Sequence, residues 1–119
     1  MTAEQMKQRT KAYAIRIVAL VDALPNTRTC SRLGQQLLDA GTSVGANYRA
    51  VCRAKSLADF INKLRIVEDE CDESLYWMEI LIETGQIKTA RVQDLMDEGG
   101  QILAIVVASA KTARTSRRA

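Results

Sequence analysis

Residues 56–85, SLADFINKLRIVEDECDESLYWMEILIETG, contain the clearest helical pattern in the chain. Apolar residues recur there three or four positions apart, as they do along one face of an α-helix. Ser56 is suited to cap the first turn, with Asp59 three residues later, and Gly85 is suited to end the helix. The stretch therefore predicts one long amphipathic helix. Its predicted buried face consists of Phe60, Leu64, Val67, Cys71, Leu75, Met78 and Ile82.

The rest of the sequence predicts three more helices with similar apolar stripes. The first covers residues 2–24 and ends before Pro25, because proline disfavours helix at the preceding residue and has no amide hydrogen to donate. The second begins at residue 27 or 29 and ends near residue 54. The last covers residues 89–111 and begins at a threonine that can cap it.

Helices joined by short loops alternate in direction, and each of these four has an apolar stripe that it cannot bury alone. The sequence therefore predicts an all-α protein, in which residues 1–110 form an antiparallel up-down-up-down four-helix bundle. Residues 111–119 are basic and lack apolar periodicity, so we expect a mobile tail. A chain of 119 residues that is 47% hydrophobic and 26% charged fits one domain.

Three glycines, Gly34, Gly41 and Gly45, fall inside the predicted second helix. A glycine inside a helix costs about 1 kcal/mol relative to alanine. Either the helix breaks at residues 40–43 and a new one begins there, or it continues and the glycines let a neighbouring helix approach closely. We favour the continuous helix, mainly because of the family resemblance given below.

No stretch is long and apolar enough to cross a membrane, which takes roughly 18 to 20 uninterrupted apolar residues. The longest candidate, residues 12–24, is interrupted by Arg16 and Asp22. The N-terminus has no basic patch followed by an apolar run, so no signal peptide is expected. We therefore expect a cytoplasmic protein without a membrane partner.

The chain contains no histidine. This excludes Ser-His and Cys-His nucleophile pairs, HExxH zinc sites and the ExxH di-iron motif. Cys30, Cys52 and Cys71 have no CxxC spacing, so we expect free, buried thiols. Residues 68–73 place carboxylates four positions apart, a pattern that can bind a hard cation. Because no nucleophile or phosphate-loop motif accompanies them, we expect no catalytic residues, no metal site, no cofactor and no enzyme activity.

Charge is unevenly distributed along the chain. Residues 1–55 carry nine basic and three acidic side chains, residues 56–84 two basic and eight acidic, and residues 85–119 six basic and three acidic. In one interpretation the basic helices neutralise the acidic one. In the other, arginines form a surface for phosphates, because guanidinium groups can fork onto phosphate oxygens. The candidate nucleic-acid-binding residues are Arg9, Arg16, Arg28, Arg32, Arg49, Arg53, Arg114, Arg117 and Arg118.

Tyr76 and Trp77 are adjacent, so their side chains point about 100° apart on a helix. We expect one to pack within the bundle and the other to lie at a helix seam or a subunit contact. Both are candidates for an interface anchor, with plain core filling as the alternative.

Three segments carry a family resemblance: GTSVGANYR at residues 41–49, AKSLADFINK at 54–63 and ESLYWMEILIETG at 73–85. In order and spacing they resemble the four-helix bundle family named for proteins encoded in intervening sequences of bacterial 23S ribosomal RNA genes. The resemblance covers nearly all of residues 12–88. One position departs from the pattern, because Ala50 stands where the family usually has glutamate.

This resemblance implies an antiparallel four-helix bundle that assembles into a ring-like homopentamer. The family is also similar in fold to the accessory variability protein of diversity-generating retroelements, which binds nucleic acid and a reverse transcriptase. By motif match, Asn47 and Arg53 on the second helix are positions to compare with Glu70 and Glu73 on the third. We expect these four side chains to form a buried polar network that fixes helix register.

The leading functional hypothesis is a non-enzymatic, oligomeric interaction protein that binds RNA or DNA through basic surfaces of the ring. Repetition around a ring would strengthen a weak site by avidity. The alternative is a protein-binding scaffold or adaptor, in which Tyr76 and Trp77 anchor a protein partner. A carboxylate-metal enzyme is a third, less favoured hypothesis.

Overall fold

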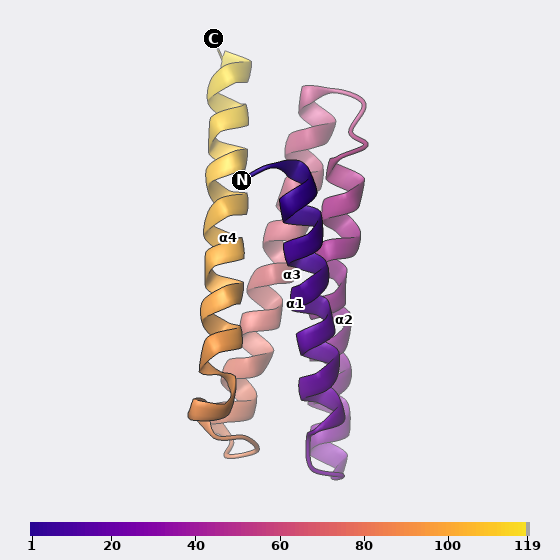
Figure 1. Ribbon diagram of the computed structural model, residues 1–119, viewed down its shortest axis with the longest axis vertical. Coiled ribbons are helices and arrows are strands. Elements are labelled where there is room, and N and C mark those ends of the chain that lie inside the picture. The colour runs from indigo at the N-terminus through magenta and orange to yellow at the C-terminus, as the bar shows by residue number, and fades with distance from the viewer. Residues whose placement is uncertain (119) are drawn as a thin grey trace.

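The computed structural model describes residues 1–118, which form four helices (Figure 1). They are α1 (Ala3–Asp22), α2 (Arg28–Val51), α3 (Leu57–Glu83) and α4 (Thr89–Arg118). No strand occurs in this part of the chain. The predicted all-α fold is confirmed.

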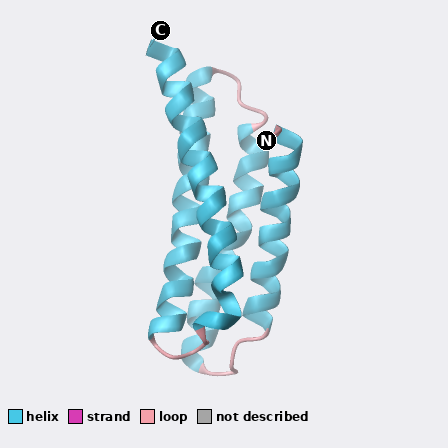
Figure 2. Ribbon diagram, turned by 60° about the vertical axis from the view of Figure 1, so that its left-hand side comes forward, coloured by secondary structure: helices cyan, strands magenta, loops and turns pink. Residues whose placement is uncertain are grey.

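The helices alternate in direction and lie nearly parallel to one long axis (Figure 1, Figure 2). Helices that follow one another in the sequence pack side by side, and α1 and α4 close the bundle. Packing is much closer between α3 and α4 than between α1 and α4. The molecule measures 51 × 21 × 20 Å. The predicted up-down-up-down bundle is confirmed, with one seam, between α1 and α4, that is only loosely closed.

The helix starts are set by side chains that satisfy free backbone amides. Thr2 and Gln5 form a reciprocal capping box at α1. The Ser56 hydroxyl accepts a hydrogen bond of 3.0 Å from the amide of Asp59, as predicted for α3. Gly85 follows the end of α3 with φ of 77°, a left-handed conformation that glycine adopts without strain. Local sequence signals therefore explain where α1 and α3 begin and where α3 ends.

The core runs along the bundle axis and draws side chains from every helix. Burial of one large aliphatic side chain contributes about 1.5–3 kcal/mol, so these contacts dominate stability. The largest fully buried hydrophobic side chains are Tyr13, Ile17, Leu37, Val44, Leu64, Val67, Met78, Leu81, Val92, Ile102 and Val106.

Helix α2 is continuous through its glycines, which face α1. A Cβ atom on Gly41 would lie 2.7 Å from Cγ1 of Ile17, and one on Gly45 would lie 3.2 Å from the carbonyl oxygen of Thr10. The glycines thus let the two backbones approach closely. The prediction of a continuous helix with close approach is confirmed, and a break at residues 40–43 is excluded.

The expected end of the last helix near Lys111 is wrong, because α4 continues to Arg118. Ala110 and Ala113 are 1% and 7% exposed and extend the buried face. Alanine has the highest helix propensity, and it can continue a helix without a visible stripe of large apolar residues. The division into a bundle of residues 1–110 and a tail stays a prediction.

All three cysteines are free thiols, as predicted. Cys30 and Cys71 are buried, but Cys52 is exposed. The expectation of burial is wrong for Cys52 because α2 ends at Val51, so Cys52 lies at the C-cap rather than on the buried face. None of the helices in residues 1–118 is long and apolar enough to cross a membrane.

Candidate nucleic-acid interface

A groove of about 530 Å³ lies between α1 and α2. Gly45 and Ala46 lie on its α2 side and Ala14 on its α1 side, so small residues leave space between the helices. Lys7 and Lys11 line it from α1. We call this feature the α1–α2 groove.

Three cations, Lys7, Lys11 and Arg49, line the α1–α2 groove together with one carboxylate, that of Glu4. Lys7 and Lys11 are four residues apart on α1, which places them about 6 Å apart along the helix axis. Within the described residues, none of the three cations forms an ion pair. Their charges are therefore available to an anionic ligand.

Arg53 lies one turn beyond Arg49 and is exposed. Its Nη1 donates a hydrogen bond of 3.1 Å to the backbone carbonyl of Arg49. Two of the predicted arginines are thus neighbours at the end of α2, and Arg49 lines the groove. Arg49 is thus the predicted arginine that lies with Lys7 and Lys11 in the α1–α2 groove.

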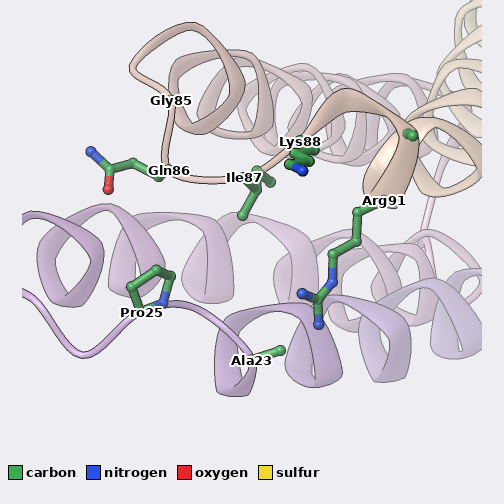
Figure 3. Close-up of a pocket in the computed structure, with 8 residues that line it drawn as sticks. Ala23, Pro25, Gly85, Gln86, Ile87, Lys88 and Arg91 are labelled. Carbon is green, nitrogen blue, oxygen red and sulfur yellow. The ribbon is translucent and has the colours of Figure 1, made fainter.

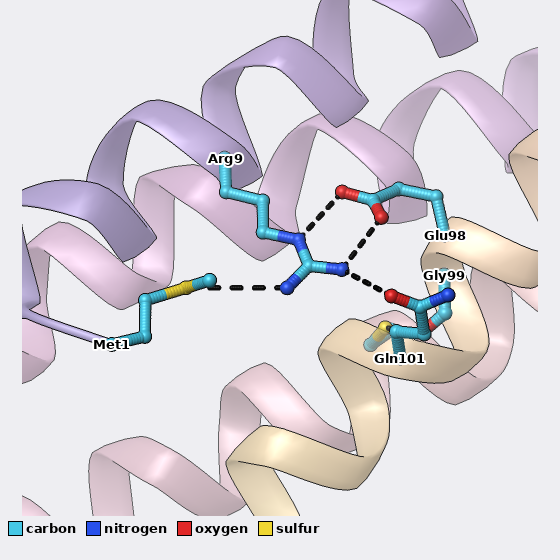
Figure 4. Close-up of polar contacts among 6 residues, drawn as sticks. Met1, Arg9, Glu98, Gly99 and Gln101 are labelled. Atoms are coloured by element: carbon cyan, nitrogen blue, oxygen red, sulfur yellow. Dashed lines mark hydrogen bonds and ion pairs between the residues drawn. The ribbon is translucent and has the colours of Figure 1, made fainter.

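Arg9 is committed to a contact within the bundle (Figure 4). Its Nε and Nη2 each donate a hydrogen bond of 2.7 Å to the Glu98 carboxylate on α4, and Nη2 donates another of 2.8 Å to Gln101. The Arg9 guanidinium lowers the pKa of Glu98, and Glu98 raises the pKa of Arg9 in turn. Arg9 therefore joins α1 to α4 and is not available in the groove.

The remaining predicted arginines do not gather at one place. Arg16 lines a pocket at the α1–α4 seam, which Arg91 also lines. Arg28 and Arg32 are exposed in the first turns of α2, far from Arg49 near its end. Arg114 is half-buried on α4. The side chains of Arg117 and Arg118 lie outside the described part of the chain.

The structure does not bring the four predicted network residues together within its described part. Asn47 donates a hydrogen bond of 2.8 Å to the carbonyl of Ser43, and Arg53 bonds to Arg49. Glu73 accepts one of 3.3 Å from the Trp77 indole. The cause is helix register, because residues equally far from the α2–α3 turn face each other. Asn47 and Arg53 lie near that turn, whereas the two glutamates lie far from it.

Glu70 lies in an acidic environment between α2 and α3. Burial is the main cause that raises its pKa, and the carboxylates of Glu73, Asp69 and Asp39 raise it further. Within the described residues, no group of cysteine, aspartate or glutamate side chains is arranged to hold a metal ion.

Tyr76 and Trp77 point in different directions, in agreement with their spacing. Tyr76 is 51% exposed, and Trp77 is half-buried against the core. Their rings meet edge to face with centroids 5.0 Å apart. Tyr76 is thus the side chain of this pair that a partner could reach.

Comparison with known proteins shows the family of the chain. The family model described as 23S rRNA-intervening sequence protein matches residues 3–108. The chain belongs to this family. A crystal structure of a protein with unknown function from the S23 ribosomal protein family of Bacteroides thetaiotaomicron is similar, with 35% identity and a TM-score of 0.86. The likeness covers 93% of this chain and 99% of that one. No curated protein matches the chain.

In this member of the 23S rRNA-intervening sequence family, sequence reasoning missed the two groove lysines, Lys7 and Lys11. Only arginines had been selected, because of their forked geometry. The signal was present, since the lysines are four residues apart on the α1 face next to the face that packs on α2. Together with Arg49, they could have been found by asking which cations flank the glycine-lined helix contact.

Proposed function

We propose that this chain is a non-enzymatic interaction protein that binds the phosphate backbone of RNA or DNA in the α1–α2 groove. The observation that carries the proposal is a groove lined by Lys7, Lys11 and Arg49, none of them in an ion pair among the described residues. The proposal includes a cytoplasmic location and a ring-like homo-oligomer, expected to be a pentamer from the family resemblance.

The proposed mechanism is electrostatic. Lysine and arginine side chains that neutralise phosphates release counterions, and this release supplies much of the affinity. Phosphate contacts of this kind carry no direct sequence information, so one groove would bind weakly and with little preference among sequences. Several grooves in one assembly would raise the affinity by avidity.

The test is titration of the purified chain with labelled single-stranded RNA and DNA of one sequence, at several salt concentrations. The groove variant carries Lys7→Gln, Lys11→Gln and Arg49→Gln. The matched control carries Arg28→Gln, Arg32→Gln and Arg65→Gln, which removes the same charge from exposed positions outside the groove. We expect the groove variant to lose at least tenfold in affinity, and its log–log salt slope to fall by about 2, at roughly 0.7 per phosphate contact.

Two results would contradict the proposal. One is no binding of the unmodified chain to either nucleic acid at low salt. The other is an equal loss of affinity in the groove variant and in the control, which would show that net charge alone decides binding.

A second candidate function is a protein-binding scaffold, favoured by the exposed ring of Tyr76. Tyrosine is among the residue types enriched at the hot spots of protein interfaces. In this case a partner would remain bound after nuclease treatment, and Tyr76→Ala would weaken it while the groove variant would not.

A further inference from the structure

The loosely closed seam between α1 and α4 contains a hollow. Two adjoining pockets of about 300 Å³ and 670 Å³ lie where the end of α1 faces the start of α4, and both are lined by Ala23 and Arg91. We call them together the α1–α4 hollow. Leu20, Val92 and Ile87 supply apolar surface to it.

The charged side chains that line the α1–α4 hollow are basic. Arg16, Lys88 and Arg91 line it, and no acidic side chain of the described residues does. Figure 3 shows Arg91 extending from α4 across the hollow toward Ala23. The three cations form no ion pair within the described part of the chain. The hollow therefore fits a ligand that offers apolar groups and carboxylates together.

The outer face of α3 offers that combination. Ile66, Asp69, Glu73 and Tyr76 follow one another at helical spacing, so they form a single stripe about 15 Å long. We call them the α3 stripe. All four side chains are exposed, and Ile66 and Tyr76 have 46% and 51% of their surface accessible. The two exposed apolar side chains, Ile66 and Tyr76, flank the two carboxylates, so the α3 stripe offers both kinds of group that the hollow fits.

The two surfaces belong to different sides of the bundle. Helices α1 and α4 adjoin each other, whereas α3 packs between α2 and α4 and makes no close backbone contact with α1 in residues 1–118. The α3 stripe therefore cannot reach the hollow of its own chain. A contact between unlike surfaces of two copies is head to tail, and such contacts generate rings when the rotation closes.

We infer that the α3 stripe of one copy docks in the α1–α4 hollow of the next copy. The inference rests on the self-assembly included in the proposed function, and it adds the two surfaces that meet. Asp69 and Glu73 pair with Lys88 and Arg91 of the next copy, while Ile66 and Tyr76 cover its apolar groups. The partner is a second copy because the chain itself carries both the acidic stripe and the basic hollow.

The test compares charge-reversal variants by sedimentation equilibrium. The hollow variant carries Lys88→Glu and Arg91→Glu, and the stripe variant carries Asp69→Lys and Glu73→Lys. All four side chains are exposed, so circular dichroism and thermal unfolding should show intact folding. We expect the association equilibrium of each variant to shift at least tenfold toward monomer, because both surfaces then carry the same sign of charge.

The chain with all four substitutions should assemble again, because its hollow is then acidic and its α3 stripe basic. Arg28→Glu with Arg32→Glu is the control and should assemble normally.

A monomeric unmodified chain would overturn the inference. So would charge-reversal variants that assemble like the unmodified chain, or a four-fold variant that stays monomeric, either of which would point to other faces or to another occupant of the hollow. Failure of the proposed nucleic-acid binding is distinguishable from failure of the inference, because the groove residues are unchanged in all these variants. An assembled chain that binds no nucleic acid would contradict the function and leave the inference standing.

Discussion

The hydroxyl oxygens of Tyr13 on α1 and Ser74 on α3 lie 2.8 Å apart in the fully buried interior. These two helices are diagonal in the bundle, so this hydrogen bond crosses its centre. Ser74 in turn donates a hydrogen bond of 2.6 Å to the carbonyl of Cys71, so Tyr13 is the donor to Ser74. Burial raises the pKa of Tyr13, which keeps its phenol protonated. The pair fixes the register of α1 against α3.

Removing the Tyr13 hydroxyl tests this role. We expect Tyr13→Phe to lower the free energy of unfolding by about 1–2 kcal/mol, since a buried hydrogen bond is lost and the space of its hydroxyl stays empty. Urea unfolding followed by circular dichroism measures the change. Tyr76→Phe serves as the control, because Tyr76 is exposed and its variant should differ by less than about 0.5 kcal/mol. Equal stability of the two variants would show that the buried pair contributes nothing.

Gly99 on α4 makes room for the same tyrosine. A Cβ atom there would lie 2.6 Å from the Tyr13 oxygen and 2.9 Å from Cδ2 of Leu75. We expect Gly99→Ala to destabilise the fold by about 1–3 kcal/mol, because the buried tyrosine cannot move aside. Gly100→Ala is the matched control, since nothing lies within 4 Å of its Cβ position. That variant should be more stable by up to about 1 kcal/mol, owing to helix propensity. Thermal unfolding of both variants measures these changes. If Gly99→Ala stabilised the fold, the close contact between this position and Tyr13 would be refuted.

The three cysteines should differ in reactivity. Burial raises the pKa of Cys71 to about 12, and Cys30 is buried beside Gln86, to which its thiol donates a hydrogen bond of 3.3 Å. Cys52 is exposed. Because the thiolate is the nucleophile, we expect one thiol per folded chain to react quickly with a maleimide at neutral pH, and three in denaturant. Mass spectrometry counts the labels, and Cys52→Ser should abolish the fast reaction. Rapid labelling of Cys71 would mean that the core opens readily.

The elements of the fold could be predicted because their causes are local. Helix α3 was predicted from its apolar spacing, from Ser56 at its start and from Gly85 after its end, and the structure has both ends where expected. The buried face is slightly rotated from the predicted one, because Ile61, Ser74 and Leu81 are buried in place of Phe60, Leu75 and Ile82, which are partly buried. The continuation of α4 was missed because Ala110 and Ala113 bury little surface each and leave no strong stripe. Helix propensity and capping signals therefore predicted where helices form. The weak apolar face near the end of α4 left its last turns unpredicted.

The side-chain partners could not be predicted because they depend on register between distant segments. Arg9 pairs with Glu98, 89 residues away, although its sequence neighbours indicate only a basic face. Glu70 was expected near Asn47 and lies instead close enough to Asp39 for that carboxylate to raise its pKa. Shifting two packed helices by one turn, about 5.4 Å, exchanges every such partner. Of the three cations that line the candidate groove, the sequence therefore predicted Arg49 and missed the two lysines.

The pairing of Arg9 with Glu98 should make stability depend on pH. The pKa of Glu98 is lowered from an ordinary value of 4.5, so its contribution is fully present above pH 4.5 and is lost as pH falls through the lower, folded-state pKa. Arg9 stays charged over this whole range, because its pKa is raised.

We expect Glu98→Gln to lower the free energy of unfolding by about 1 kcal/mol at neutral pH, because partly buried, bidentate ion pairs stabilise a fold more than exposed pairs do. The difference from the unmodified chain should shrink steadily as pH falls below 4.5. Urea unfolding at several pH values measures it, with Asp94→Asn on the same helix as the control for loss of a carboxylate. A difference that stays constant between pH 7 and pH 3 would show that the charge of Glu98 does not stabilise the α1–α4 seam.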